Sequence, residues 1–321
     1  MSFRLRIGSR PSALALAQAR LIKAGIEAAL PGLVAEIVAV STSGDKLTTA
    51  SLAQVGGKGL FIRELEQALA AGKIDLAVHS MKDLPAILPS EFRIAAVPAR
   101  EDARDALITG GGGGWNRLAR GARLGTSSTR RRLEALRLRP DLEVIPQRGN
   151  VDTRLAKLAA GDFDAIILAM AGLRRLGKLG SIACTELDER EFVPSGGQGA
   201  LAIEARATGP IGGADEIEAA VVAHNDPRTL AEVTAERAFL ATIGASCVSP
   251  VGVKASVDGE ALKIHALLFS VDGARNLADE ISAAYRIENE GAGLASAAAA
   301  IGAALGRRMI ERGARDLIAI A

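Results

Sequence analysis

The sequence predicts a protein with two α/β domains followed by a smaller α+β domain. Its N-terminal two thirds alternate short apolar segments with helical ones, which is typical of mainly parallel sheets covered by helices. The C-terminal third instead places a long helix, a hairpin-like stretch and a second long helix in succession. With 321 residues, the chain is long enough for two or three compact domains.

The first domain is expected to span residues 1–99 and to be completed by residues from about 194 to 220. Its first helix should run from Ser12 to Leu30 and stop at Pro31-Gly32. Residues 42–59 are rich in Ser, Thr and Gly and are predicted to form a mobile loop. A second helix is expected at 60–71, ended by a glycine. The predicted strands are residues 4–7, 35–41 and 74–79.

The second domain is expected over residues 100–193, with helices between its strands. Five consecutive glycines at 110–114 indicate a flexible surface loop. Residues 196–204 are again β-like, so the chain is expected to re-enter the first domain there. Two crossings between two α/β domains would make a hinged pair with a central cleft. The predicted strands are residues 106–109, 123–125, 142–146 and 165–169.

The third domain is expected over residues 221–321. A helix at 227–243 precedes a stretch with Asp258-Gly259 and Asp272-Gly273 turns, which favours hairpins. A final helix is predicted at 294–312. These elements form a small α+β domain.

Composition excludes several classes of protein. The formal net charge is only +2 and aromatic residues make up 3%, so nucleic acid is an unlikely partner. The N-terminus lacks the apolar core of a signal peptide, and no apolar stretch is long enough to span a bilayer. The two cysteines, Cys184 and Cys247, are expected to be free thiols in a reducing cytoplasm. Without a Cys/His spacing pattern, no metal site is predicted.

Arginines repeatedly follow a predicted strand and open a predicted helix. In α/β sheets, ligands bind beyond the carboxyl ends of the strands, where helix N-termini offer unpaired N–H groups. Guanidinium groups match the geometry of carboxylates and phosphates. The arginines at these junctions are Arg10, Arg130, Arg131, Arg132, Arg148, Arg154, Arg174 and Arg175.

A single arginine at a junction is compatible with an ordinary solvated helix residue. Five junctions with the same arrangement favour a ligand that carries several negative charges.

Asp83 lies in Val78-His79-Ser80-Met81-Lys82-Asp83-Leu84-Pro85, directly after an apolar strand. Its carboxylate could simply cap the turn before Leu-Pro. Alternatively, it could hold a cationic amine, move a proton or stabilise a positive intermediate in a partly closed cleft. The neighbouring Lys82 would keep it ionised.

Cys247 lies in a Gly/Ser/Pro-rich loop after a predicted helix. A lone cysteine of this kind is compatible with a small buried hydrophobe. A loop between a helix and a strand is, however, a better place for covalent chemistry than a core. No histidine lies nearby, so a protease-like Cys-His nucleophile is poorly supported. Cys184 is interpreted as structural.

From end to end the chain resembles the hydroxymethylbilane synthase (porphobilinogen deaminase) family. A single motif would be weak evidence for membership of this family, whereas eight motifs in the same order are specific evidence. They are IGSRPSALA at 7–15, GKGLF at 57–61, VHSMKDLP at 78–85, GTSSTRR at 125–131, RGNVDTRL at 148–155, AGLRRLG at 171–177, Gln198-Gly199-Ala200 and Cys247-x-x-Pro250-x-Gly252.

The resemblance implies three domains, of which the first two are like a periplasmic binding protein. It implies a dipyrromethane cofactor joined by a thioether to Cys247. Four porphobilinogen molecules would be added in turn to that cofactor, and water would release linear hydroxymethylbilane. Asp83 would assist the loss of ammonia and stabilise the positively charged azafulvene. The resemblance also suggests a monomer.

Roles for individual residues follow from the resemblance. Each pyrrole unit carries an acetate and a propionate, so a growing chain accumulates carboxylates for the arginines to neutralise. The loop at 42–59 would act as a lid, and Phe61 could stack on a pyrrole ring. The cofactor-binding residues would be Lys82, Asp83, Ser128, Arg130 and Arg131, beside Cys247. The substrate-binding residues would be Arg10, Ser12, Gln18, Lys58, Phe61, Ser80, Thr126, Ser127, Arg148, Arg154, Arg175 and Gln198.

Two places depart from the family pattern. Ala245 and Ser246 precede the cofactor cysteine where two glycines are expected, which affects the freedom of the loop. The segment before Gln198 is unusually rich in glycine. The main alternative function is a non-catalytic anion-binding protein with the same two lobes, which would need the arginines but neither Asp83 nor Cys247.

Overall fold

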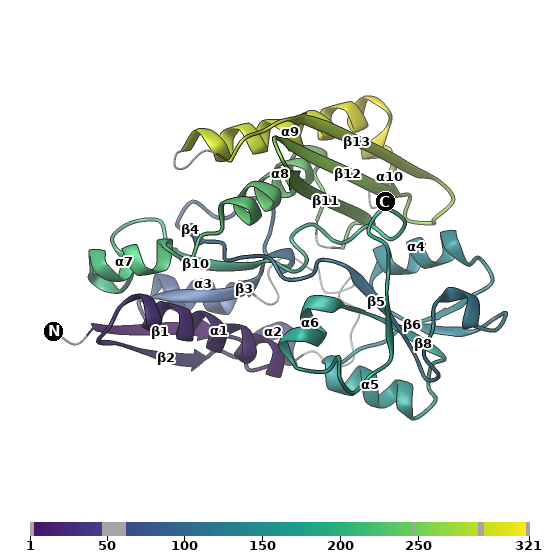
Figure 1. Ribbon diagram of the computed structural model, residues 1–321, viewed down its shortest axis with the longest axis horizontal. Helices are drawn as coiled ribbons and strands as arrows, with labels where there is room; N and C mark the ends of the chain where they lie inside the picture. The colour runs from purple at the N-terminus through teal and green to yellow at the C-terminus, as the bar shows by residue number, and fades with distance from the viewer. Residues whose placement is uncertain (1–2, 47–61, 247, 288–291, 319–321) are drawn as a thin grey trace. The chain divides into compact units, whose positions relative to one another are not determined.

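A computed structural model describes residues 3–46, 62–246, 248–287 and 292–318 (Figure 1). By its internal contacts the chain divides into two compact units. The first comprises residues 1–100 and 200–230, and the second comprises residues 101–199 and 231–321. Among the described residues, no helix is both long and apolar enough to cross a membrane.

The first unit contains a five-stranded sheet in the order β2-β1-β3-β10-β4. β1 pairs in parallel with β2 and β3, whereas β10 runs antiparallel to both of its neighbours. The reversed strand is the one formed after the chain returns from the second unit. Its strands are β1 (Phe3–Ser9), β2 (Leu33–Ala39), β3 (Leu76–Ser80), β4 (Phe92–Ala96) and β10 (Leu201–Arg206).

Helices cover both faces of this sheet (Figure 1). Side chains alternate between faces along a strand, so Val78 packs with α1 whereas Ala77 packs with α3. α7 packs on the same face as α1. The helices of this unit are α1 (Ala13–Ala29), the short α2 (Ser43–Lys46), α3 (Arg63–Ala70) and α7 (Asp215–Val222).

The second unit repeats this arrangement in a sheet of order β7-β6-β8-β5-β9. β6 pairs in parallel with β7 and β8, and β5 is the reversed strand. α4 packs on one face and α5 and α6 on the other. The elements are β5 (Asp105–Thr109), β6 (Arg123–Gly125), α4 (Thr129–Leu138), β7 (Glu143–Ile145), α5 (Val151–Ala159), β8 (Ala165–Ala169), α6 (Met170–Arg175) and β9 (Cys184–Glu186).

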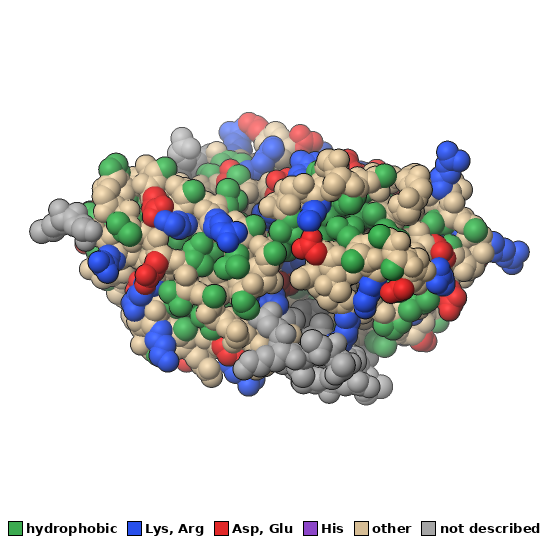
Figure 2. Space-filling view, turned by 90° about the horizontal axis from the view of Figure 1, so that it is seen from below, with side chains coloured by type: hydrophobic (Ala, Val, Ile, Leu, Met, Phe, Trp, Pro, Cys, Tyr) green, Lys and Arg blue, Asp and Glu red, His purple; other side chains and the backbone are tan. Residues whose placement is uncertain are grey.

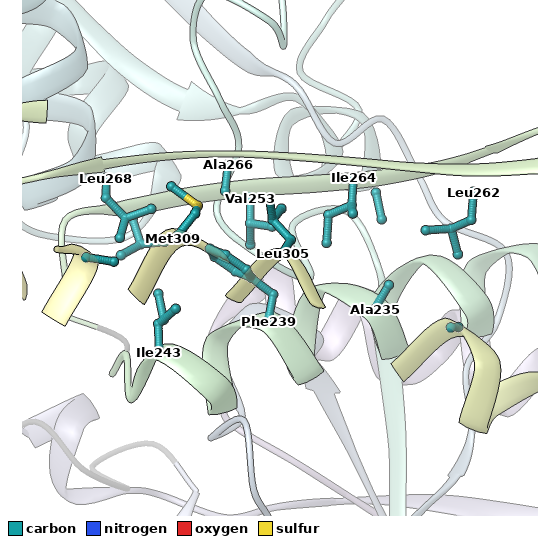
Figure 3. Packing of buried hydrophobic residues seen from close by; sticks show 14 of the residues in the cluster. Ala235, Phe239, Ile243, Val253, Leu262, Ile264, Ala266, Leu268, Leu305 and Met309 are labelled. Carbon is teal, nitrogen blue, oxygen red and sulfur yellow. The ribbon is translucent and has the colours of Figure 1, made fainter. Parts of the chain in front are cut away.

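The C-terminal part of the second unit is a three-stranded antiparallel sheet packed against helices (Figure 3). Phe239 and Leu305, from two helices, meet Val253 and Leu268 of the sheet. The two helices approach closely, since a Cβ on Gly302 would lie 2.0 Å from the Ala235 carbonyl oxygen. The elements are α8 (Pro227–Ile243), β11 (Val251–Asp258), β12 (Ala261–Phe269), β13 (Asn276–Ala284), α9 (Ala292–Glu311) and α10 (Ala314–Ile318).

The opposite face of this small sheet packs against α4. Leu267 and Phe269 of β12 form a buried cluster with Leu133 of α4 and with Val193. The Val253 N–H also donates to the Pro194 carbonyl oxygen at 2.8 Å. The C-terminal α+β part is therefore packed and hydrogen-bonded to the α/β sheet of its own unit.

The predicted fold class is confirmed: the chain has two mixed α/β sheets and a small C-terminal α+β part. The β-like segment predicted at 196–204 is wrong in its first half, because β10 begins only at Leu201. Gly197 and Gly199 have φ of 76° and 87°, a left-handed conformation that glycine tolerates and a strand does not contain. Part of the loop predicted at 42–59 is the short helix α2, and residues 47–59 lie outside the described residues.

Candidate active site

A pocket in the first unit brings together residues from two of the predicted motifs. β1 ends at Ser9 and β3 ends at Ser80, and the two strands are parallel neighbours. Their carboxyl ends therefore meet at one edge of the sheet, where α/β proteins bind ligands. The pocket is lined by Arg10, Ser12, Leu14, Ala15, Gln18, Ile62, Val78, His79, Ser80 and Asp83.

The first helix fixes two of these residues. Ser12 is the N-cap of α1, and its hydroxyl oxygen accepts from the Ala15 N–H at 3.3 Å. Gln18 is buried, and its amide nitrogen donates to the Ser80 hydroxyl at 2.9 Å. This contact joins the end of β3 to α1, so Ser80 is held in place.

Asp83 is the last residue of a short 3-10 helix, Met81–Asp83, that follows β3. The turn is closed by its backbone, since the Leu84 N–H donates to the Met81 carbonyl oxygen at 3.2 Å. Among the described residues, no hydrogen bond or ion pair engages the exposed Asp83 carboxylate. The turn-capping interpretation therefore finds no support, and the carboxylate is available to a ligand.

In the second unit, Arg130 and Arg131 converge on the buried carboxylate of Asp105. Arg130 donates to Asp105 Oδ2 at 2.7 Å, and Arg131 donates to Asp105 Oδ1 at 2.6 Å. The Gln198 amide nitrogen also donates to Asp105 Oδ1 at 2.9 Å. All four side chains are less than a tenth exposed. Both arginines are thus fixed by interactions within the protein rather than extended into solvent.

The loop before α4 orders three predicted hydroxyl groups. Thr126 is buried, and its hydroxyl accepts from the Ser128 N–H at 3.2 Å. Ser128 is the N-cap of α4. Ser127 is exposed, and its hydroxyl donates to the Gln147 carbonyl oxygen at 2.8 Å. The loop is thereby tied to the segment that carries Arg148.

Arg154 is a partly buried cation without a carboxylate partner among the described residues. Its Nε donates to the Gly149 carbonyl oxygen at 2.8 Å. Burial, together with the nearby positive charge of Arg131, lowers the pKa of Arg154 to about 10. A ligand carboxylate would relieve both effects, and the acetate and propionate chains of a pyrrole unit carry such groups.

Arg175 and Gln198 both hold the glycine-rich segment before β10. Arg175 donates to the Gly199 carbonyl oxygen at 2.7 Å, and burial lowers the pKa of this arginine. The Gln198 amide nitrogen donates to the Ala103 carbonyl oxygen as well as to Asp105, so both of its hydrogens are used inside the protein. The two unexpected glycines before Gln198 have structural reasons: a Cβ on Gly196 would lie 2.8 Å from Leu240 Cδ1, and Gly197 has φ of 76°.

The loop that carries Cys247 begins where α8 ends. Gly244 has φ of 75°, and the Ala245 N–H donates to the Leu240 carbonyl oxygen, which terminates the helix. The Ser246 N–H then donates to the Ser249 hydroxyl at 3.0 Å. A serine in place of the expected glycine is thus accommodated in a hydrogen-bonded turn. Three predicted site residues, Cys247, Lys58 and Phe61, lie outside the described residues.

Sequence reasoning missed two buried acids beside the arginines, Asp105 and Glu134. The available signal was weak: Asp105 directly precedes a strongly apolar strand, and Glu134 lies four residues after Arg130 on one helix. Neither sequence position predicts that the carboxylate of Asp105 or of Glu134 is buried.

Comparisons with known proteins bear on the whole chain. Residues 5–210 match the family model "Porphobilinogen deaminase, dipyromethane cofactor binding domain", and residues 230–311 match "Porphobilinogen deaminase, C-terminal domain". A porphobilinogen deaminase of Syntrophobacter fumaroxidans is 44% identical over 314 residues, covering 98% of this chain and 96% of its own. One of Sorangium cellulosum is 47% identical over 275 residues, covering 86% and 90%. Among solved structures, the probable amino-acid ABC transporter extracellular-binding protein ytmK from Bacillus subtilis aligns with a TM-score of 0.42 and 13% identity, over 69% of this chain and 91% of that one.

The two family models and the curated relatives define the chain as a transferase. The chain belongs to the porphobilinogen deaminase family. The predicted family, enzyme class and dipyrromethane cofactor are thereby confirmed. The alternative of a non-catalytic anion-binding protein is not favoured.

Proposed function

We propose that this chain condenses four porphobilinogen molecules head to tail, with loss of ammonia, onto a dipyrromethane cofactor attached to Cys247, and then releases hydroxymethylbilane by hydrolysis. The observation that carries this proposal is the exposed carboxylate of Asp83, which has no partner among the residues that the structure describes and lies in a pocket that also contains Arg10. A carboxylate there faces the side where a porphobilinogen amine and its acidic side chains would bind.

Asp83 is the catalytic residue in this proposal. Its negative charge holds the protonated amine of the substrate and stabilises the positive charge that remains when ammonia leaves. The same carboxylate exchanges protons with the pyrrole N–H group. The cofactor, when attached to Cys247, supplies the pyrrole carbon to which each unit is joined. Ser80, fixed by Gln18, orients the 3-10 helix that presents Asp83.

The cationic and hydroxyl side chains bind the acetates and propionates of the pyrrole units. Arg10, Arg148, Arg154 and Arg175 are assigned to substrate carboxylates. The proposed cofactor ligands are Arg130, Arg131, Ser128 and Lys82. Ser12, Gln18, Lys58, Phe61, Ser80, Thr126 and Ser127 complete the substrate site. Gln198 contributes by positioning Asp105, and through it Arg130 and Arg131.

The proposed enzyme works as a monomer in the cytoplasm, without nucleic acid or membrane partners. On the face shown in Figure 2, positive and negative side chains are interspersed, as the net charge of +2 leads one to expect. The two family models and the two sheets are compatible with a three-domain division at residues 1–99 with 194–220, 100–193 and 221–321.

Removal of one carboxylate-binding arginine tests the proposal. In Arg154→Ala, we expect enzyme species that carry one to three added pyrrole units to accumulate at least tenfold over wild type, because a lengthening chain loses a counter-charge; one charge-assisted hydrogen bond supports about this factor. Native mass spectrometry after a pulse of porphobilinogen measures the distribution. Arg120→Ala, an exposed arginine of the same unit, is the matched control. A normal distribution in Arg154→Ala would contradict the assignment, and a wild-type enzyme that gains no pyrrole mass would refute the function.

A further inference from the structure

Glu134 is a fully buried acid whose two oxygens differ in their surroundings. One, Oε2, accepts from the Arg130 guanidinium at 2.9 Å. The other, Oε1, is buried and has no hydrogen-bond partner in the part of the chain that the structure describes. It lies against the backbone of Gly252, where an added Cβ would be 2.9 Å from Oε1 and 2.6 Å from the Val193 carbonyl oxygen. Gly252 is the last residue of the Cys247-x-x-Pro250-x-Gly252 motif.

The charges in this cluster can be counted because all of its members are buried. Arg130 and Arg131 are the cations, and Asp105 and Glu134 are the acids. With both acids ionised, these four side chains carry no net charge, so the two arginines are neutralised within the protein. Arg154, whose pKa is lowered by burial and by the nearby positive charge of Arg131, is a further cation beside the cluster. With Glu134 protonated, one positive charge is unmatched. An ionised carboxylate with one oxygen unpaired in a dry site is strongly unfavourable, which favours the protonated form.

The neighbouring elements act on the Glu134 carboxyl in both directions, and their sum favours its protonated form. Burial, the largest influence, and the negative charge of Asp105 on β5 raise the pKa of Glu134, which lies at about 8 once the opposing positive charges are included. Arg130 and Arg137, from the same helix, oppose these effects. From the loop before β10 and from β11, the facing groups are the neutral Val193 carbonyl and Gly252.

We propose that Glu134 is a positioning residue that stays protonated while the acidic pyrrole chain is bound, so that Arg130 and Arg131 keep one unmatched positive charge for a ligand carboxylate. This rests on the proposed function of those two arginines. When Glu134 ionises, Arg130 pairs with it fully and the cluster releases its hold on the ligand. Glu134 thus sets the charge of the cofactor site without touching the cofactor.

Ionisation of Glu134 also changes the free energy of unfolding in a direction that can be predicted. Its pKa is raised in the folded state above the unfolded value, so the folded protein binds more protons between the two values. Stability contributed by protonated Glu134 is therefore present at low pH and lost as the pH rises through about 8. Binding of the cofactor should follow the same direction.

The test uses four full-length proteins: wild type, Cys247→Ser, Glu134→Gln and the double variant. The stabilisation due to the cofactor is the difference in Tm between each protein that retains Cys247 and its serine counterpart. In the wild-type background we expect this difference to shrink by about 3 °C or more between pH 7 and pH 9, as the loss of one ionic hydrogen bond predicts. With Glu134→Gln, whose amide imitates the protonated acid, the difference should not change with pH.

Each outcome of this test has a distinct meaning. The same pH dependence in both backgrounds would overturn the role of Glu134, provided that intact mass shows the cofactor on wild type. Lack of that mass would overturn the proposed function and this inference together. Glu143→Gln, an exposed acid on β7 of the same unit, is the matched control and should behave as wild type.

A spectroscopic measurement covers the case in which Glu134→Gln fails to fold. Infrared spectra of the wild-type holoenzyme should show absorption from a protonated carboxyl group at pH 7, which fades as the pH rises above 8. Absence of that absorption at pH 7 would overturn the inference without any variant.

Discussion

Replacement of Asp83 by Asn should lower the turnover of porphobilinogen by about 10²- to 10⁴-fold, the range typical of losing a positioned charge or general acid–base group. The asparagine keeps the shape of the side chain but removes the negative charge that stabilises the departing amine and the resulting cation. Folding and cofactor attachment should be unchanged, because no hydrogen bond engages this carboxylate among the described residues. Steady-state kinetics, with intact mass on the same sample, measures both.

Asp215→Asn provides the control for this experiment. Asp215 is an exposed acid in the first turn of α7, in the same unit as Asp83. Its replacement should leave turnover within about twofold of wild type, since surface changes of this kind have small effects. Near-normal product formation by Asp83→Asn would refute the catalytic role proposed for that residue.

Replacement of Asp105 by Asn should destabilise the protein by about 3–5 kcal/mol, the range for breaking a buried ion pair by removing one partner. Asp105 is fully buried and accepts from Arg130, Arg131 and Gln198. An amide in its place leaves two buried guanidinium groups short of negative charge. The shift in the urea midpoint of unfolding, multiplied by m, the dependence of the unfolding free energy on urea concentration, gives the loss in free energy.

An exposed Asp–Arg pair in the same unit serves as a control, because it shows how much stability such a pair contributes without burial. Asp164 accepts from Arg123 at 3.0 Å, but their side chains are 44% and 39% exposed. Asp164→Asn should therefore cost less than about 1 kcal/mol, as surface ion pairs do. Equal losses of unfolding free energy in Asp105→Asn and Asp164→Asn would contradict the claim that burial strengthens the contribution of the Asp105 cluster to stability.

The sequence patterns predicted most of the fold because the strands are apolar and their helices end at clear signals. Each of the seven strands predicted in the two α/β domains lies within two residues, at both ends, of an observed strand: β1, β2, β3, β5, β6, β7 and β8. The patterns missed β4 and β9 and the reversed direction of β5 and β10. Strand direction depends on where the chain crosses between units, and no local periodicity records that.

Prediction of the site succeeded for residues whose position follows from the ends of the predicted strands. Arg10, Ser12, Gln18, Ser80 and Asp83 do line one pocket, because parallel strands end at a common edge. Prediction of the site was incomplete for residues whose role depends on whether their side chains are buried. Arg130 and Arg131 look from sequence like exposed ligands for an anion, and only their contacts reveal the buried acids that set their charge.

The central claim is that a cysteine thiol holds an acidic oligomer that guanidinium groups neutralise. Intact mass spectrometry of the denatured protein tests it most directly. Wild type should be heavier than its sequence by one dipyrromethane group, and Cys247→Ser should have the mass of its sequence alone. A wild-type protein that is folded and active yet carries no added mass would contradict the account.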